Sequence, residues 1–273
     1  VERETGRLTD SRVSELPDWL RPHDRLIMNN SRVVPARLVG QRTRTGAKWE
    51  GLFLREASPG RWELLGKTRG KLEAGETIRI PAEDESRPSL ELNMIEKRDD
   101  GSWLATPTMA GMSSESSAFE WLAVYGRIPL PPYMEREPVT ADRDRYQTTY
   151  ASVDGSVAAP TAGLHFTPEL FSRCVARGIE RDEVTLHVGI GTFRPVSAER
   201  LADHTMHYEW CELSAAVVER LHSTRAAGGR IVAVGTTSVR TLETASSAAK
   251  ATGAMSPGRF TSAYCGETNL FIR

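Results

Sequence analysis

The hydrophobic pattern changes once along the chain, near Ser152, and this change constrains the fold more than any other feature. From Val39 to about Thr108, short runs such as KWEGLFLRE and RWELLGKT alternate apolar with polar residues, and turn residues such as Ser58-Pro59-Gly60 separate them. Five or six such strands without a convincing helix predict a small barrel or sandwich. After Ser152, strand and helix patterns alternate, which predicts α/β structure with parallel strands.

Capping residues locate the helices of the second half. Four hydroxyl side chains are predicted to be helix N-caps: Thr167, Ser197, Ser214 and Ser238. Pro168 follows the first of them, where its fixed backbone angle suits the first helical turn, and Gly178 ends that helix. The last helix is expected to run to about Lys250. The strand-like runs GSVAAP, DEVTLHVG and RIVAVG come before these helices or between them.

These patterns predict a mixed α/β fold with two domains. The larger α/β domain comprises residues 1–38 and 127–273, and a smaller β-barrel-like domain is inserted at residues 39–126. The insert is expected to end in a helix capped by Ser116 or Ser117. The proline-rich segment GRIPLPPY follows, and its prolines favour an extended backbone over a helix.

Composition bounds the class of protein. With 39% apolar and 26% charged residues, the 273-residue chain is typical of soluble globular proteins. Its net charge of −1 gives no overall basic field, although a local basic patch could still bind a polyanion. Three scattered cysteines without a CxxC pair, and no signal-like or membrane-length apolar run, predict a cytoplasmic protein. Because the sequence starts at Val1 without a methionine, we expect a piece of a longer chain.

Three loops share one plan, in which a polar, glycine-bearing turn follows a strand. They are APTAGLHF (159–166), HVGIGTF (187–193) and VGTTSVR (234–240). If their strands are parallel neighbours, the loops converge at the carboxyl ends of the strands, where α/β proteins bind ligands. The third loop offers hydroxyls and free N–H groups at a helix start, which suits an anion, although simple capping by Ser238 is an alternative.

Two histidines lie within or beside these loops, and neutral imidazole can act as acid or base near neutral pH. His165 is in the first loop, where a purely connecting segment has little need of a histidine and a phenylalanine together. His187 alternates with apolar neighbours and could equally be a hydrogen-bonded core histidine. Basic residues also cluster, among them Lys67, Arg69 and Lys71, but a charged run is usually only a solvated surface.

Seven segments occur in the order of one known family: NNSRVVPARL, GRIPLPPY, DRYQTTYA, GSVAAPTAGLHF, TLHVGIGTFRPV, MHYEW and VAVGTTSVRTLE. On these motifs the chain closely resembles the S-adenosylmethionine:tRNA ribosyltransferase-isomerases of queuosine biosynthesis. In the small β region only the general strand pattern agrees. Arg127 stands where the family often has histidine, and family members continue beyond GETNLFIR.

The resemblance implies an enzyme that uses S-adenosylmethionine as a ribosyl donor. The ribosyl moiety is transferred to preQ1 at the wobble position of tRNA and isomerised, which gives epoxyqueuosine and releases adenine and methionine. It implies no metal and no further cofactor. The partner is tRNA carrying preQ1 in its anticodon loop, no membrane is involved, and we expect a monomer.

Such chemistry needs a base, an acid and a neutral amine. We hypothesise that His165 and His187 supply the acid and the base, with Glu209 as a partner for the sulfonium or the amine. Phe166 or Phe193 is expected to stack on adenine or preQ1.

The remaining predicted contacts are assigned to two ligands. Residues predicted to bind S-adenosylmethionine are Thr161, Gly163, Phe166, Gly191, Thr192, Phe193, Thr236, Thr237, Ser238 and Arg240. Residues predicted to bind tRNA are Arg32, Arg37, Arg143 and Arg145. Within the first set, the Thr236–Ser238 turn is expected to hold the methionine carboxylate.

Two other functions fit parts of the pattern. A conventional methyltransferase using the same cofactor would leave a homocysteine-containing product rather than free adenine and methionine. A non-catalytic RNA-binding module, with the small β domain as its platform, would bind tRNA without consuming a cofactor.

Overall fold

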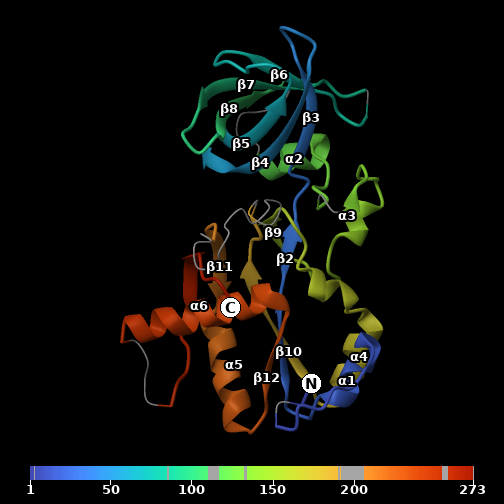
Figure 1. Ribbon diagram of the computed structural model, residues 1–273, viewed down its shortest axis with the longest axis vertical. Helices are drawn as coiled ribbons and strands as arrows, with labels where there is room; N and C mark the ends of the chain where they lie inside the picture. Colours follow the sequence, from blue (N-terminus) through green and yellow to red (C-terminus); the bar gives the residue numbers. More distant parts are fainter. Residues whose placement is uncertain are drawn as a thin grey trace.

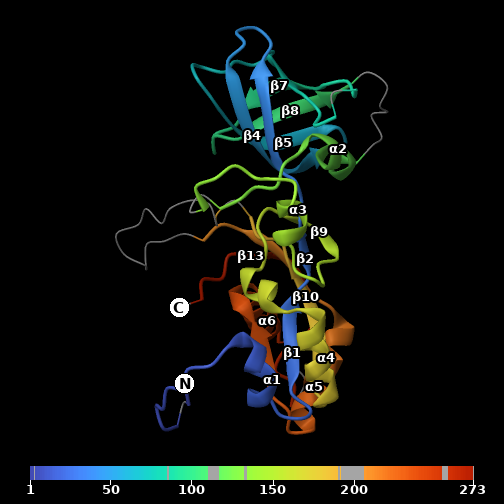
Figure 2. The same cartoon turned by 90° about the vertical axis from the view of Figure 1, so that its right-hand side faces the viewer.

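The computed structural model describes residues 1–2, 4–84, 86–109, 117–131, 134–189, 191, 206–253 and 258–272. Within these ranges the strands form a closed barrel, a five-stranded sheet and a two-stranded sheet. The barrel lies at one end of the long axis and the five-stranded sheet with its helices at the other (Figures 1 and 2). The predicted mixed α/β class with a small β-barrel is therefore confirmed.

The barrel is closed by six antiparallel strands in the order β3-β4-β5-β8-β7-β6. The strands are β3 (Arg37–Arg42), β4 (Lys48–Ser58), β5 (Arg61–Thr68), β6 (Thr77–Ile80), β7 (Leu90–Lys97) and β8 (Trp103–Thr108). Burial alternates along β7 and β6, because successive side chains point to opposite faces of a strand. Closure leaves no unpaired strand edge, which explains how so small a set of strands can be stable.

Trp49 fills the barrel interior because two glycines make room for its ring. Gly51 on β4 pairs with Gly66 on β5. A Cβ atom on Gly51 would lie 2.0 Å from the Trp49 ring, and one on Gly66 would lie 2.8 Å from it. The glycines are thus required by the close approach of the indole, which is fully buried.

Helix α2 (Ala118–Tyr125) packs against the barrel core. Ser117 caps it, and Glu120 completes a capping box with the Ser117 backbone. Trp121 meets Trp62 of β5 edge-to-face, with ring centroids 6.3 Å apart. Ser117 is therefore the cap, as predicted; the alternative, Ser116, lies outside the described residues.

The five-stranded sheet has the order β12-β1-β10-β11-β13. Its central strand β1 (Arg25–Asn29) is parallel to both β12 (Ile231–Val234) and β10 (Glu180–Leu186). β10 and β12 are thus parallel to each other, as predicted for the second half of the chain, but each pairs with β1 from the first part rather than with the other. The sequence reading did not predict β11 (Glu209–Leu213) and β13 (Tyr264–Thr268), which add an antiparallel edge.

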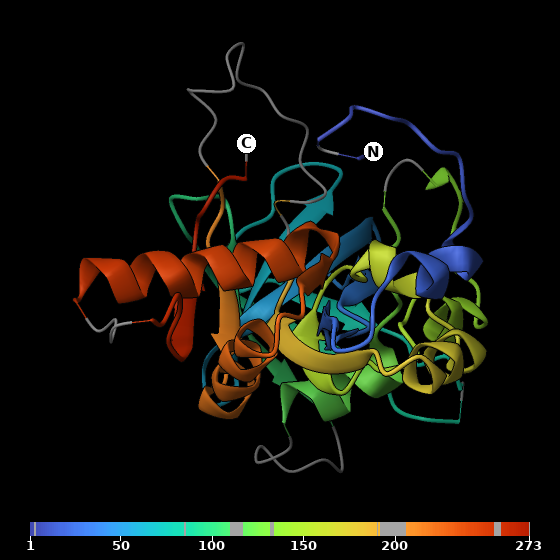
Figure 3. The same ribbon diagram turned by 90° about the horizontal axis from the view of Figure 1, so that it is seen from below.

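Helices cover both faces of this sheet. The helices are α1 (Leu16–Trp19), α4 (Pro168–Ala176), α5 (Ala215–Ala226) and α6 (Gly235–Ala251). In Figures 1 and 3, α5 and α6 lie to the left and α1 and α4 to the right. Leu26 and Met28 pack with α4, whereas Ile27 packs with α5 and α6. Covering from both sides explains why all of β1 is buried.

Two predicted boundaries are wrong. Helix α6 begins at Gly235 rather than after a Ser238 cap, because Gly235 adopts φ +81° and lets β12 turn directly into the helix. Ser238 is buried and donates to the Val234 carbonyl at 2.9 Å. The strand expected at GSVAAP is β9 (Val153–Ser156), which pairs with β2 (Ser31–Val33). The predicted Ser197 cap lies outside the described residues.

The described residues also form three short helices. They are η1 (Val13–Glu15), α3 (Asp142–Arg145) and η3 (Thr161–His165). Ser214 caps α5 and Thr167 caps α4, as predicted. Among the described residues, the helices lack the length and hydrophobicity that a membrane-spanning helix requires. The domain boundaries at residues 38/39 and 126/127 remain predictions.

Candidate active site

A cavity of about 480 Å³ lies between the barrel and the rest of the molecule. The barrel side supplies β4 residues 53–56 and residues 117–119 at the start of α2. The opposite side supplies residues around β9, residues 187–189 after β10, and residues 208–210 at the start of β11. Figure 1 shows β9 and β11 directly below β4 and α2, where the barrel meets the rest of the molecule.

His187 lies in this cavity wall, directly after β10. Its ring stacks on Trp210, with centroids 5.2 Å apart and an interplanar angle of 19°. It also contacts Gly155, where a Cβ atom would lie 2.8 Å from ring atoms. Gly155 adopts φ +143°, so both its backbone and its missing side chain suit this contact.

The imidazole of His187 is suited to accept a proton. Burial lowers its pKa below the ordinary value, and the negative charge of Asp154 opposes that shift. The ring is therefore neutral at pH 7. Its buried Nδ1 has no hydrogen-bond partner among the described residues, whereas a hydrogen-bonded core histidine would have one.

Glu209 connects two of the predicted loops. This buried carboxylate begins β11, and its Oε1 accepts a hydrogen bond of 2.9 Å from the Gly189 N–H. Its Oε2 forms an ion pair with Arg240 on α6. The pair holds the segment after β10 against α6 at the edge of the cavity.

The three loops converge, although their strands do not share one sheet. Val157 N–H donates to the Val188 carbonyl at 2.9 Å, which joins the first loop region to the second. A Cβ atom on Gly235 would lie 3.1 Å from Ala162 Cβ, so η3 abuts the start of α6. β10 and β12 flank β1, while β9 lies in the separate pair with β2.

The first-loop residues differ from their predicted placement. Phe166 is 3% exposed and packs against Phe171 in the core around α4, with ring centroids 5.5 Å apart, so it offers no free ring face. Gly163 is buried against Tyr150. His165 and Thr161 are exposed on η3 and are not among the residues lining the cavity.

The second and third loops are placed as follows. Gly191 lies against His207, where a Cβ atom would be 2.7 Å from the imidazole. Thr236 and Thr237 form the first turn of α6. Thr192 and Phe193 lie outside the described residues.

The predicted tRNA-binding arginines are not equally available. Arg37 binds Glu137 at 2.6 Å and Glu50 at 3.1 Å, and these hydrogen bonds raise its pKa. Arg32 donates to the Ala151 carbonyl at 2.8 Å. Arg145 is exposed on α3. Arg143 lies 3.6 Å from Glu83.

The predicted site residues include none of the four aromatic residues that line the cavity, Phe53, Phe119, Tyr208 and Trp210. Tyr208 is 65% exposed and Phe119 is 42% exposed, and they line the cavity from the β11 side and the α2 side. Tyr208 could have been found, because it is two residues from Trp210 and alternate residues of a strand share a face. Phe119 gives no such signal, since it resembles any exposed residue of a short helix.

Comparisons with known proteins identify the family. The family described as "Queuosine biosynthesis protein" matches residues 1–273. A protein of Thermosynechococcus vestitus named S-adenosylmethionine:tRNA ribosyltransferase-isomerase is 42% identical over 273 residues, which is 100% of this chain and 71% of that protein. The chain belongs to this family. A ribosyltransferase-isomerase of Chelativorans sp. is 43% identical over 278 residues, covering 100% of this chain and 74% of that protein.

Membership of the ribosyltransferase-isomerase family confirms the resemblance found in the seven motifs, and with it an enzyme of the transferase and isomerase type. A relative of the same name from Azorhizobium caulinodans is 41% identical over 270 residues, covering 97% of this chain and 72% of that protein. A solved structure of S-adenosylmethionine tRNA ribosyltransferase from Thermotoga maritima is 26% identical, with a TM-score of 0.38. The match covers 99% of this chain and 68% of the Thermotoga maritima chain. Within the described ranges, no group of three or more His, Cys, Asp or Glu could hold a metal ion.

Proposed function

We propose that the chain transfers the ribosyl moiety of S-adenosylmethionine to preQ1 at the wobble position of tRNA and isomerises it. The products are epoxyqueuosine in the RNA, adenine and methionine. The observation that carries the proposal is that one cavity is lined by His187, whose ring is neutral at pH 7, and by the buried Glu209, which is ion-paired with Arg240. The cavity volume of about 480 Å³ is within the range of small-molecule sites.

The charged groups of the site complement those of S-adenosylmethionine. Arg240 and the free N–H groups in the first turn of α6 bind the methionine carboxylate. Glu209 faces the positive sulfonium or the amine. Its two oxygens keep acceptor capacity beyond the bonds to Gly189 and Arg240, because an ionised carboxylate has about four lone-pair sites.

His187 acts as the base. The sulfonium acidifies the neighbouring carbon, and a neutral imidazole in the cavity wall can take the proton from it. His165, exposed on η3, is proposed as the acid that assists the departure of adenine. Tyr208 and Phe119, rather than the buried Phe166, offer exposed ring faces for the purine or for preQ1.

The decisive experiment incubates the chain with S-adenosylmethionine and an anticodon stem-loop containing preQ1. Mass spectrometry of the products should show free adenine, free methionine and RNA of epoxyqueuosine mass. A methylated RNA with a homocysteine-containing product would instead establish a methyltransferase. Bound but unchanged RNA would establish a binding module, and either result would refute the proposal.

The acid assignment has its own test. His165→Ala should reduce adenine release by more than about tenfold, or roughly 1.4 kcal/mol of barrier. His222 on α5 is a suitable control, because it packs on Phe260 away from the cavity-lining residues. If His165→Ala and His222→Ala behave alike, His165 is not the acid.

A further inference from the structure

The outer surface of β4 and β5 carries cations that the proposed chemistry does not use. Lys48 begins β4, and Lys67 and Arg69 lie at the end of β5 and just after it. The strand register pairs Trp49 with Thr68 and Glu50 with Lys67. Lys48, Lys67 and Arg69 are therefore neighbours across the two strands, and all three are exposed. We call these three residues the basic ribbon.

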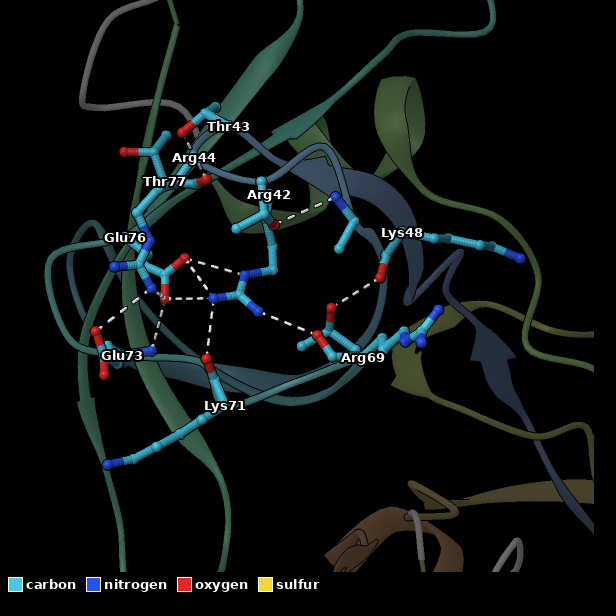
Figure 4. Close-up of polar contacts among 12 residues, drawn as sticks. Arg42, Thr43, Arg44, Lys48, Arg69, Lys71, Glu73, Glu76 and Thr77 are labelled. Carbon is cyan, nitrogen blue, oxygen red and sulfur yellow. Dashed lines mark hydrogen bonds and ion pairs between the residues drawn. The ribbon is translucent and has the colours of Figure 1, made fainter.

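A buried ion pair fixes the backbone that carries Arg69. The guanidinium of Arg42 binds Glu76 at 2.7 Å and donates to the carbonyls of Arg69, at 3.1 Å, and Lys71, at 2.9 Å (Figure 4). The side chains of Lys48 and Arg69 point to the same side, away from the ion pair, whereas Lys71 points the opposite way (Figure 4). The Arg69 loop thus has a defined shape with its cation directed outward.

The basic ribbon has excess positive charge. Neither Lys67 nor Arg69 forms an ion pair with any residue that the structure describes. Lys48 binds Glu50 at 2.7 Å, and Arg37 shares that carboxylate. Arg79 on the same barrel binds Glu91 at 3.3 Å, whereas Arg61 and Lys71 are, like Lys67 and Arg69, without an ion pair among the described residues. A run of cations with one shared carboxylate attracts anions.

The ribbon leads to the candidate active site. A second cavity, of about 440 Å³, is lined by Lys67, Glu50 and Leu52 on the barrel and by residues 129–130 of the proline-rich segment. The next residues of β4, 53–56, line the catalytic cavity. One strand therefore connects the basic ribbon, the second cavity and the active site.

We propose that the basic ribbon binds the phosphate backbone of the tRNA anticodon stem while the anticodon loop occupies the catalytic cavity. The inference rests on the proposed function, because that function brings tRNA to this cavity. Lys48 and Leu54 are six residues apart on β4, or about 20 Å of strand, so the ribbon contacts RNA beyond the reacting nucleotide. Phosphate contacts of this kind position the substrate without reading its sequence.

The test compares two double variants of the full chain that lose the same charge. Lys67→Ala with Arg69→Ala removes two cations of the ribbon. The control, Lys71→Ala with Arg61→Ala, removes the oppositely directed cation of the same loop and the cation at the other end of β5. All four side chains are exposed, so both proteins should fold. The Kd for a preQ1 anticodon stem-loop is measured over a series of salt concentrations.

The ribbon variant should bind at least tenfold more weakly at low salt, and its slope of log affinity against log salt should fall by about 1 to 2. The control should change affinity by less than about twofold, and adenine release at saturating RNA should be unchanged in both. If the two variants lost the same affinity for the RNA, or if neither lost any, the proposal that the basic ribbon binds the anticodon stem would be wrong. If the unmodified protein binds RNA without releasing adenine, the proposed function fails separately.

Discussion

Arg42 in the barrel and the Nδ1 of His187 in the wall of the candidate active site are both buried, but they are paired differently. In the barrel, all three guanidinium nitrogens of Arg42 have partners, supplied by Glu76 and two backbone carbonyls. In the active-site wall, the buried Nδ1 of His187 has no partner among the described residues. A fully paired group fixes the shape of its surroundings, whereas an unpaired nitrogen keeps a hydrogen-bonding capacity that no described protein group uses. The Nε1 of Trp49 in the barrel core also has no partner among the described residues, but only His187 of these two lines a cavity.

The largest expected effect tests the chemical side of this comparison. His187→Ala should lower the rate of adenine release by about 10²- to 10⁴-fold, because a general base contributes on that order. His222→Ala, which alters another histidine packed against an aromatic ring, should stay within about twofold. Unfolding monitored by circular dichroism should show both variants folded. A His187→Ala enzyme with near-normal turnover would remove this residue from the mechanism.

The next largest effect is expected from the buried Arg42–Glu76 ion pair of the barrel. Arg42→Ala should lower the free energy of unfolding by about 3–5 kcal/mol, because it leaves Glu76 buried without its main partner. Arg44→Ala, at an exposed residue near the same carboxylate, should cost less than about 1 kcal/mol. Denaturant titration measures both. If Arg42→Ala reduced turnover of the folded protein without loss of stability, Arg42 would not be the purely stabilising residue that the comparison makes it.

A smaller effect is expected from packing inside the barrel. Gly51→Ala places a methyl group against the Trp49 ring and should cost about 1–3 kcal/mol of stability. Combining it with Trp49→Phe should relieve the clash, so the double variant should be more stable than the sum of the single losses predicts. If thermal unfolding showed that the stability losses of the two single variants simply add in the double variant, the Trp49 ring would not be what restricts the side chain at position 51.

The smallest effect is a pH dependence from His187. Its folded pKa is lowered by burial, so the unfolded chain binds more protons below the ordinary histidine pKa of about 6.5. Stability should therefore fall as pH decreases below about 6.5 and should be insensitive to this group above it. The acid limb of kcat/KM should lie below the same pH. Denaturant titrations between about pH 5 and 7.5 should show a weaker slope for His187→Gln; an unchanged slope would contradict the assignment.

Local patterns predicted most of the barrel and several helices. Antiparallel strands joined by short turns show their alternation directly, and Ser117, Thr167 and Ser214 cap helices as expected. The β11–β13 pair was missed because its strands are short and their hydrogen-bonded partners are far apart in the chain, as with Glu209 and Thr268. The start of α6 was misplaced because the conformation of Gly235 decides it, and glycine permits several.

For the candidate site, the sequence indicated the three loops but not the role of each side chain. Phe166 looked available on its loop, yet the packing of η3 against α4 turns its ring into the core. Arg37 looked free, yet Glu50 and Glu137, the latter 100 residues away, bind it. Exposure and charge pairing are properties of the assembled surface and have no local signature.

The sequence by itself determined the family, most of the element types in each half and the three loops, because motifs, strand alternation and capping depend on neighbouring residues. Tertiary structure decided which of these groups can meet a ligand. His187 gains its lowered pKa and its unpaired nitrogen only when Gly155 and Trp210 close around its ring. Glu209 meets Arg240 only when β11 and α6 pack together, since desolvation and ion pairing require residues distant in sequence to become neighbours in space.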